Sequence, residues 1–169
     1  EVYKHTAKEA VGSVLDGFNA TVFAFGPTGT GKTYTMKGLV DPVEKGVIPR
    51  ALEDVFAAIQ QKKAADPGFE ARVRVSHLQV YNEQISDLLT LDPKPLRVVH
   101  TPARVLVENL TEHVVENARE ATALLQVGED QRKTASTVLN QLSSRSHTIF
   151  TVLLETWTLR FVGTDGCVV

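Results

Sequence analysis

The chain has 169 residues, of which 43% are hydrophobic and 22% charged, so its composition predicts one globular domain with a real core. A net charge of −2 leaves no basic footprint for nucleic acid or acidic membranes, and no apolar run is long enough to cross a bilayer. The single cysteine, Cys167, excludes an internal disulfide and most cysteine-based metal sites, which favours a reducing, cytosolic compartment.

The stretch from Tyr3 to Phe18 predicts an amphipathic helix. Its apolar residues recur at helical spacing on one face: Tyr3, Ala7, Ala10, Val14 and Phe18. Gly17 and Asn19 suit the C-terminal end of this helix. The chain opens at Glu1 rather than Met, directly in a helical pattern, so we expect an excerpt of a longer protein.

Residues Thr21 to Phe25 form an apolar run that predicts a buried parallel strand, and a glycine-rich loop follows it directly. The loop has the spacing G-x-x-x-x-G-K-[ST] and consists of Gly26, Pro27, Thr28, Gly29, Thr30, Gly31, Lys32 and Thr33. Glycines let backbone N–H groups surround a phosphate, and a following helix adds its N-terminal donors and positive dipole end.

The side chains after the last glycine supply the rest of a triphosphate site. Lys32 can reach the β- and γ-phosphates, and the hydroxyl of Thr33 can ligate Mg²⁺. The alternative is a Gly- and Thr-rich turn that matches by accident, and the strand pattern before the loop and the helix pattern after it count against that reading. The sequence therefore predicts that the chain binds a nucleoside triphosphate with Mg²⁺, or descends from one that did.

Beyond this loop, the chain predicts an exposed loop from Lys37 to Pro49 and then a helix that begins at Pro49. The apolar residues of this helix lie at i, i+3, i+4 and i+7: Leu52, Val55, Phe56 and Ile59. Alternating Val and Arg residues predict a strand from Phe69 to Tyr81. A short helix is expected around Ile85 to Leu89, and a small antiparallel ribbon of three pieces from Leu96 to Val115.

Asn117 followed by Glu120 resembles a capping box that opens a further helix. This helix is expected to bury Ala121, Leu124, Leu125 and Gly128, with a polar helix end and loop over residues 129–146. Thr148 to Leu159 predicts the last strand. The expected fold class is α/β, with three layers and a mixed central sheet flanked by helices, and with the phosphate site at the carboxyl end of the strand near Phe25.

A second polar cluster, Asn140 to His147, reads N-Q-L-S-S-R-S-H. Three serines, an Arg, an Asn and a His offer hydroxyls for a metal or its waters, and a cation for a carboxylate or phosphate. Taken alone, this composition is more typical of a solvated polar loop.

Together the two segments resemble the kinesin motor family, whose switch I has the pattern N-x-x-S-S-R-S-H and whose phosphate loop precedes it in the same order and separation. Further matching stretches extend the resemblance from Val2 to about Glu155: Gly17–Thr21, Tyr34–Met36, Gly46–Ala51, Val80–Glu83, Asp87–Leu89 and Thr134–Ala135. The resemblance implies an ATPase that converts hydrolysis into movement along microtubules in the cytoplasm, on the cytoskeleton, without nucleic acid or membrane partners.

By position, the resemblance implies that Ser144 completes the Mg²⁺ shell begun by Thr33, and that Asn140 and Ser143 close around the γ-phosphate and the attacking water. It implies that Arg145 pairs with a glutamate of switch II, and that Tyr34 packs against adenine; a half-buried helix aromatic is the equal alternative for Tyr34. Pro27 replaces a commoner Gln, and proline has no N–H to donate to phosphate.

The end of the chain departs from the family pattern. A kinesin continues from the last strand into the switch II motif D-L-A-G-S-E, whereas residues 160–169 contain none. The glutamate partner of Arg145 and the main microtubule-binding elements are therefore not found, and neither are the neck and coiled coil of a full-length parent. We expect residues 1–159 to be a partial motor domain and 160–169 a divergent end.

Two other functions stay open. A truncated motor fold could serve as a non-hydrolysing interaction module, and another nucleotide-binding enzyme, such as a nucleotide kinase, would share the phosphate loop but not the segment Asn140 to His147. Arg72, Arg74 and Arg104 could touch an acidic filament, although a solvated strand face is the simpler reading. The sequence does not give the oligomeric state of the parent.

Overall fold

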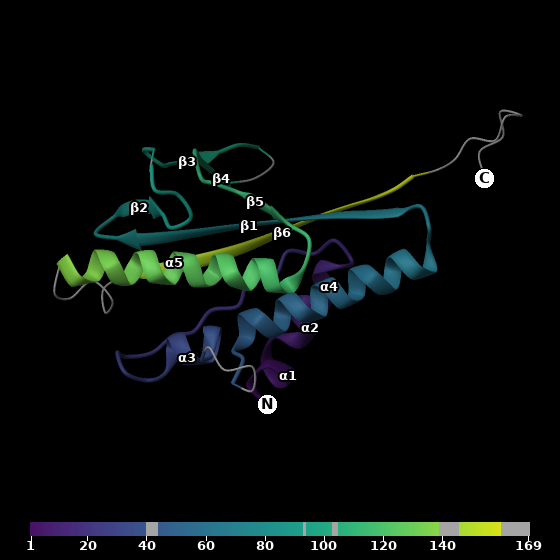
Figure 1. The fold of residues 1–169 in the computed structure, drawn as a ribbon, viewed down its shortest axis with the longest axis horizontal. Coiled ribbons are helices and arrows are strands. Elements are labelled where there is room, and N and C mark those ends of the chain that lie inside the picture. The colour runs from purple at the N-terminus through teal and green to yellow at the C-terminus, as the bar shows by residue number, and fades with distance from the viewer. Residues whose placement is uncertain (40–43, 93, 103–104, 139–145, 160–169) are drawn as a thin grey trace, which may run out of the picture. The chain divides into compact units, whose positions relative to one another are not determined.

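The computed structural model describes residues 1–39, 44–92, 94–102, 105–138 and 146–159. The chain divides into two compact units, one of Glu1–Arg72 and Leu154–Val169 and one of Val73–Leu153. Its helices and strands follow one another along the chain as Figure 1 labels them. Within the described residues, no helix has the length and apolar character needed to span a membrane.

In the first unit the predicted N-terminal helix is present but broken in two, as α1 (Val2–Thr6) and α2 (Lys8–Val14). The break falls at Ala7, whose φ of −114° departs from helical geometry. Just before it, the Thr6 hydroxyl donates to the carbonyl of Val2, 2.8 Å away, and such side-chain bonds compete with regular helix geometry. Ala7 itself is fully buried, as its place on the apolar face predicts.

Helix α4 (Val47–Ala65) supplies most of the core of the first unit. Leu52, Val55 and Ile59 are all buried, which confirms the predicted apolar face. The helix begins two residues earlier than expected, and Pro49 lies in its first turn, where a missing N–H costs nothing. α1 and α2 pack against α4, and the Tyr3 hydroxyl donates to Asp54 Oδ2 at 2.7 Å. Burial and this hydrogen bond raise the pKa of Tyr3.

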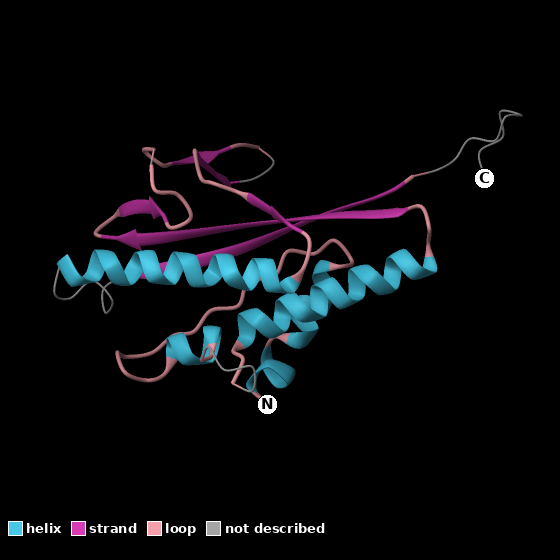
Figure 2. Ribbon diagram, in the orientation of Figure 1, coloured by secondary structure: helices cyan, strands magenta, loops and turns pink. Residues whose placement is uncertain are grey.

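The predicted buried strand from Thr21 to Phe25 is wrong in this structure, where Figure 2 draws the segment as loop. Phe23 and Phe25 are 79% and 94% exposed, while Val22 and Ala24 are half-buried. The alternation shows an extended chain with one covered face. A buried strand also needs hydrogen-bonding neighbours at its edges, and no described strand pairs with this segment.

Strand β1 (Phe69–Tyr81) has the predicted bounds, and β6 (His147–Thr158) confirms the last predicted strand to within a residue. Strands β2 (Gln84–Asp87), β5 (His113–Val115) and β6 all pair with β1 in one four-stranded sheet. The pairings of β1 with β2 and with β5 are antiparallel, with Tyr81 opposite Gln84 and Val73 opposite Val115.

The short helix expected around Ile85 to Leu89 is wrong, because β2 occupies this stretch. Asn82 and Glu83 both have positive φ values, 48° and 61°, which make a tight two-residue hairpin turn between β1 and β2. Asp87 then fixes the chain after β2. Its buried carboxylate accepts the N–H groups of Leu89 and Thr111, at 2.8 and 2.7 Å.

The ribbon expected over residues 96–115 is partly present. β3 (Arg97–His100) and β4 (Val105–Glu108) pair with each other, whereas the third piece, β5, joins β1 instead. Helix α5 (Ala118–Val138) opens with the predicted cap, since the Glu120 N–H donates to Asn117 Oδ1 at 3.0 Å. It ends at Val138, inside the stretch of residues 129–146 over which a polar helix end and loop are expected, and a helix surface accommodates polar side chains on an exposed face.

Helix α5 lies directly against β1 at Gly128. His77 of β1 is 1% exposed, and its ring lies edge-on to Phe150 of β6 with centroids 5.5 Å apart. A Cβ at position 128 would overlap His77 Nδ1, so glycine is what lets the helix lie on the imidazole.

Replacing Gly128 with Ala should lower the free energy of unfolding by roughly 1–3 kcal/mol, because His77 is too buried to move aside. Gly12 of α2 is the matched control: a Cβ added there would meet nothing within 4 Å, so Gly12→Ala should stabilise by up to about 1 kcal/mol. Urea unfolding of both variants measures the two signs. A neutral or stabilising Gly128→Ala would contradict the close packing.

Candidate phosphate site

The glycine-rich loop has a backbone that only glycine adopts readily. Gly26, Gly29 and Gly31 have φ values of 149°, 86° and 85°. Three positions within six residues therefore have positive φ values that residues with a side chain rarely adopt. Gly31 is the N-cap of α3 (Lys32–Lys37), and its carbonyl accepts the N–H of Thr35 at 2.8 Å. The predicted sequence of loop and helix start is therefore confirmed.

Lys32 is the first residue of α3, and its side chain turns back over the loop. Its ammonium donates to the carbonyl oxygens of Gly26 and Pro27, at 2.8 and 2.7 Å. The Thr30 hydroxyl donates to the same Pro27 carbonyl at 2.9 Å. Pro27 thus contributes a hydrogen-bond acceptor although it has no N–H. The Lys32 ammonium and the Thr30 hydroxyl together hold the two ends of the loop close to each other.

The residues present fit a Mg²⁺–triphosphate better than a metal held by protein alone. Among the described residues, no group of three His, Cys, Asp or Glu side chains could hold a metal ion. The side chain of Thr33 is exposed in the first turn of α3, one residue from the Lys32 ammonium. Mg²⁺ commonly takes few protein ligands and completes its shell with waters and substrate phosphates.

Tyr34 is 52% exposed, and the structure gives it a partner that the sequence did not suggest. Its hydroxyl donates to Glu44 Oε2 at 3.1 Å, and this hydrogen bond, with the negative charge of Glu44, raises the pKa of Tyr34. Glu44 lies where the chain returns toward α3, since Leu39 N–H donates to its carbonyl at 3.0 Å. Tyr34 also lines a cleft of about 220 Å³ between the starts of α1 and α4.

Asn140, Ser143, Ser144 and Arg145 lie outside the described residues, so their predicted roles are untested. The end of their segment is described: Ser146 is half-buried and His147 begins β6 with an exposed side chain. Ser146 belongs to the second unit and the phosphate loop to the first. That the two converge on one anion stays a prediction.

The other candidate residues have structural partners. The Arg72 guanidinium lies over the ring of Trp157, 5.7 Å from its centroid, and Arg74 pairs with Glu112 at 2.9 Å. Arg104 is outside the described residues. These contacts favour the strand-face reading of the two arginines over a filament-binding one.

A family description and several known proteins are similar to this chain. The family description "Kinesin motor domain" matches residues 1–162. The chain is 40% identical to the kinesin-like protein KIF9 of Mus musculus over 161 residues, which are 91% of this chain and 20% of that protein. It is 41% identical to KIF3C of Bos taurus over 158 residues, with 92% and 19% covered.

A solved structure of a fast kinesin is similar over 99% of this chain and 46% of its own, with a TM-score of 0.85 and 35% identity. The fold class is therefore the α/β fold of that structure. The chain spans about a fifth of the length of the curated relatives named above.

Replacing Glu44 with Gln should lower the pKa of Tyr34, because the carboxylate that holds its proton loses its charge. Tyr34 would then ionise at a lower pH than in the unchanged chain. A spectrophotometric titration of tyrosinate measures this, and Tyr34→Phe identifies the step that belongs to Tyr34. An unchanged titration in Glu44→Gln would show that the contact does not form.

Proposed function

Because the chain belongs to the kinesin motor-domain family, we propose that it is the ATP-binding part of a microtubule motor ATPase. The family is one of microtubule motor ATPases, and this chain is a partial motor domain. The observation that carries the proposal is the loop itself: three glycines with positive φ lead into α3, and the Lys32 ammonium donates to carbonyl oxygens of the same loop.

Lys32 and the loop backbone bind the β- and γ-phosphates in this proposal. The Lys32 ammonium now rests on two neutral carbonyl oxygens. Phosphate oxygens carry formal negative charge and form stronger, charge-assisted bonds, so the ammonium exchanges the carbonyls for them when ATP binds. Gly26, Gly29 and Gly31 let the backbone follow the phosphates closely, and Tyr34 lies one turn further on to meet the base.

Mg²⁺, held by Thr33 and Ser144 in this proposal, would neutralise charge on the transferring phosphoryl group. Asn140 and Ser143 orient the water that attacks in line with the γ-phosphate, and Arg145 matches the arginine that pairs with a switch II glutamate. The protein's own contribution is thus positioning and electrostatic stabilisation rather than covalent chemistry.

The partner in this proposal is the microtubule, and the location is the cytoskeleton in the cytoplasm. Support comes from the similar fast kinesin, whose structure is described with implications for its ATPase mechanism and interactions with microtubules. A second candidate is an interaction module without turnover. Phe23 and Phe25, both strongly exposed beside the phosphate loop, favour it because they offer apolar area to another chain.

Replacing Lys32 with Ala should weaken binding of Mg²⁺–ATP by roughly ten- to a hundredfold, because one charged hydrogen-bond donor to phosphate is lost. Lys37→Ala, at the other end of α3, is the matched control and should bind as the unchanged chain does. Equilibrium binding of a fluorescent ATP analogue, with and without Mg²⁺, measures both.

Equal affinities for the two variants would contradict the proposed site. Release of phosphate over time separates the two candidate functions, because an interaction module binds without turnover whereas a motor ATPase hydrolyses ATP.

A further inference from the structure

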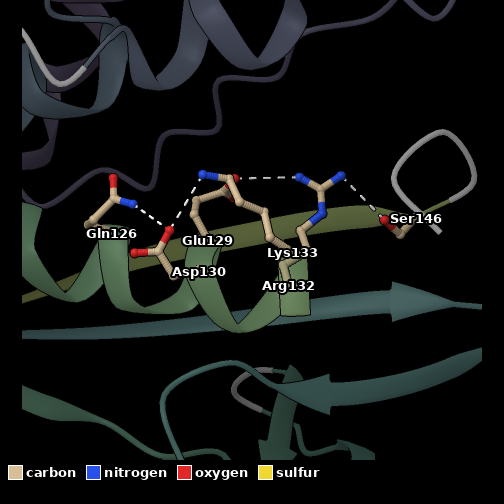
Figure 3. Close-up of polar contacts among 6 residues, drawn as sticks. All are labelled: Gln126, Glu129, Asp130, Arg132, Lys133 and Ser146. Carbon is tan, nitrogen blue, oxygen red and sulfur yellow. Dashed lines mark hydrogen bonds and ion pairs between the residues drawn. The ribbon is translucent and has the colours of Figure 1, made fainter. Parts of the chain in front are cut away.

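Polar side chains of α5 between Gln126 and Lys133 form two rows of contacts (Figure 3). The two rows differ in burial. In the outer row, Asp130 accepts from Gln126 Nε2 at 2.7 Å and from Lys133 Nζ at 3.4 Å. The side chains of Asp130 and Lys133 are 59% and 68% exposed. Such contacts on the solvent side contribute little to stability.

The inner row is largely buried and reaches a second element. Arg132 Nη1 lies 3.6 Å from Glu129 Oε2, and the two side chains are 14% and 9% exposed. Arg132 Nη2 donates to Ser146 Oγ at 3.4 Å, so one guanidinium contacts a carboxylate of its own helix and a hydroxyl that directly precedes β6 (Figure 3). A planar fork of donors suits such a double contact, which the single ammonium of lysine does not reproduce.

The inner row lies beside a closely packed point of the second unit. Gly128, directly before Glu129, rests on the buried ring of His77, and that ring meets Phe150 of β6. Helix α5 and strand β6 are thus both fixed against β1 near this point. Arg132 extends the same packing to Ser146, where the chain returns to the sheet.

We propose that Arg132 is a positioning residue, which together with Glu129 holds Ser146 and thereby orients the end of the polar segment Asn140 to His147. The inference rests on the proposed function, in which that segment contacts the γ-phosphate. In this role Arg132 acts through Ser146 rather than by contacting phosphate. ATP binding therefore depends on Arg132 more than ADP binding does, because ADP has no γ-phosphate.

The test compares Arg132→Ala with Lys133→Ala. The second variant also removes one positive charge, but from the neighbouring residue, which belongs to the outer row. Arg132→Ala should reduce affinity for Mg²⁺–ATP about tenfold more than affinity for Mg²⁺–ADP. Lys133→Ala should leave the ratio of the two affinities unchanged. Ser146→Ala should lower the ratio of ATP affinity to ADP affinity, as Arg132→Ala does. Ser146→Thr keeps the hydroxyl and should preserve this ratio.

Amide hydrogen exchange tests the contact without nucleotide. The amides of His147 and Thr148, at the start of β6, should exchange faster in Arg132→Ala and at the original rate in Lys133→Ala. Equal exchange in the two variants, or an equal loss of ATP and ADP affinity in Arg132→Ala, would overturn the positioning role. Failure of the unchanged chain to bind either nucleotide would instead refute the proposed function and the role with it.

Discussion

The hydrogen-bond ladder of β1 is the constraint on which the second unit depends. Strands β2, β5 and β6 each pair with it, so three separate stretches of the chain are held in register by one backbone. The same strand carries His77, on which α5 packs through Gly128 and against which Phe150 lies. Because a helix and a neighbouring strand are fixed at one buried ring, the start of β6 has a defined place relative to the end of α5.

The phosphate loop depends on local residues instead. Residues Thr21 to Phe25 before it have no strand partner among the described residues, yet the loop keeps its three positive-φ glycines and its bound lysine. Its shape is therefore set by glycine conformation, by the start of α3 and by the contacts of Lys32 and Thr30 with Pro27. A loop whose shape is set by its own residues can present the same backbone N–H groups to a phosphate whether or not a paired strand precedes it.

Sequence reasoning succeeded where a local pattern determines structure. The alternation in Phe69–Tyr81, the helical spacing around Leu52 and the Asn117–Glu120 cap each specify their elements within a few residues. The phosphate loop was predictable for the same reason, since its spacing encodes its backbone. The family assignment followed from two motifs with fixed order, and the comparisons support it.

Sequence reasoning failed where distant residues decide the outcome. The spacing of Ile85, Leu88 and Leu89 fits a helix, but the turn at Asn82 and the pairing with β1 make residues 84–87 a strand. Partners such as Glu44 for Tyr34 and Arg132 for Ser146 join residues 10 and 14 positions apart in the sequence, and no spacing rule identifies them. Such contacts are set by tertiary structure.

In the proposed function, the loop of residues 26–33 and the segment ending at Ser146 bind one triphosphate. Amide chemical shifts of the isotope-labelled chain, recorded with Mg²⁺–ADP and with Mg²⁺–ATP, test it most directly. The account predicts that the Gly29 and Gly31 amides shift with both nucleotides, and that the Ser146 amide shifts only with ATP. Unmoved glycine amides, or a Ser146 amide that ignores ATP, would contradict it.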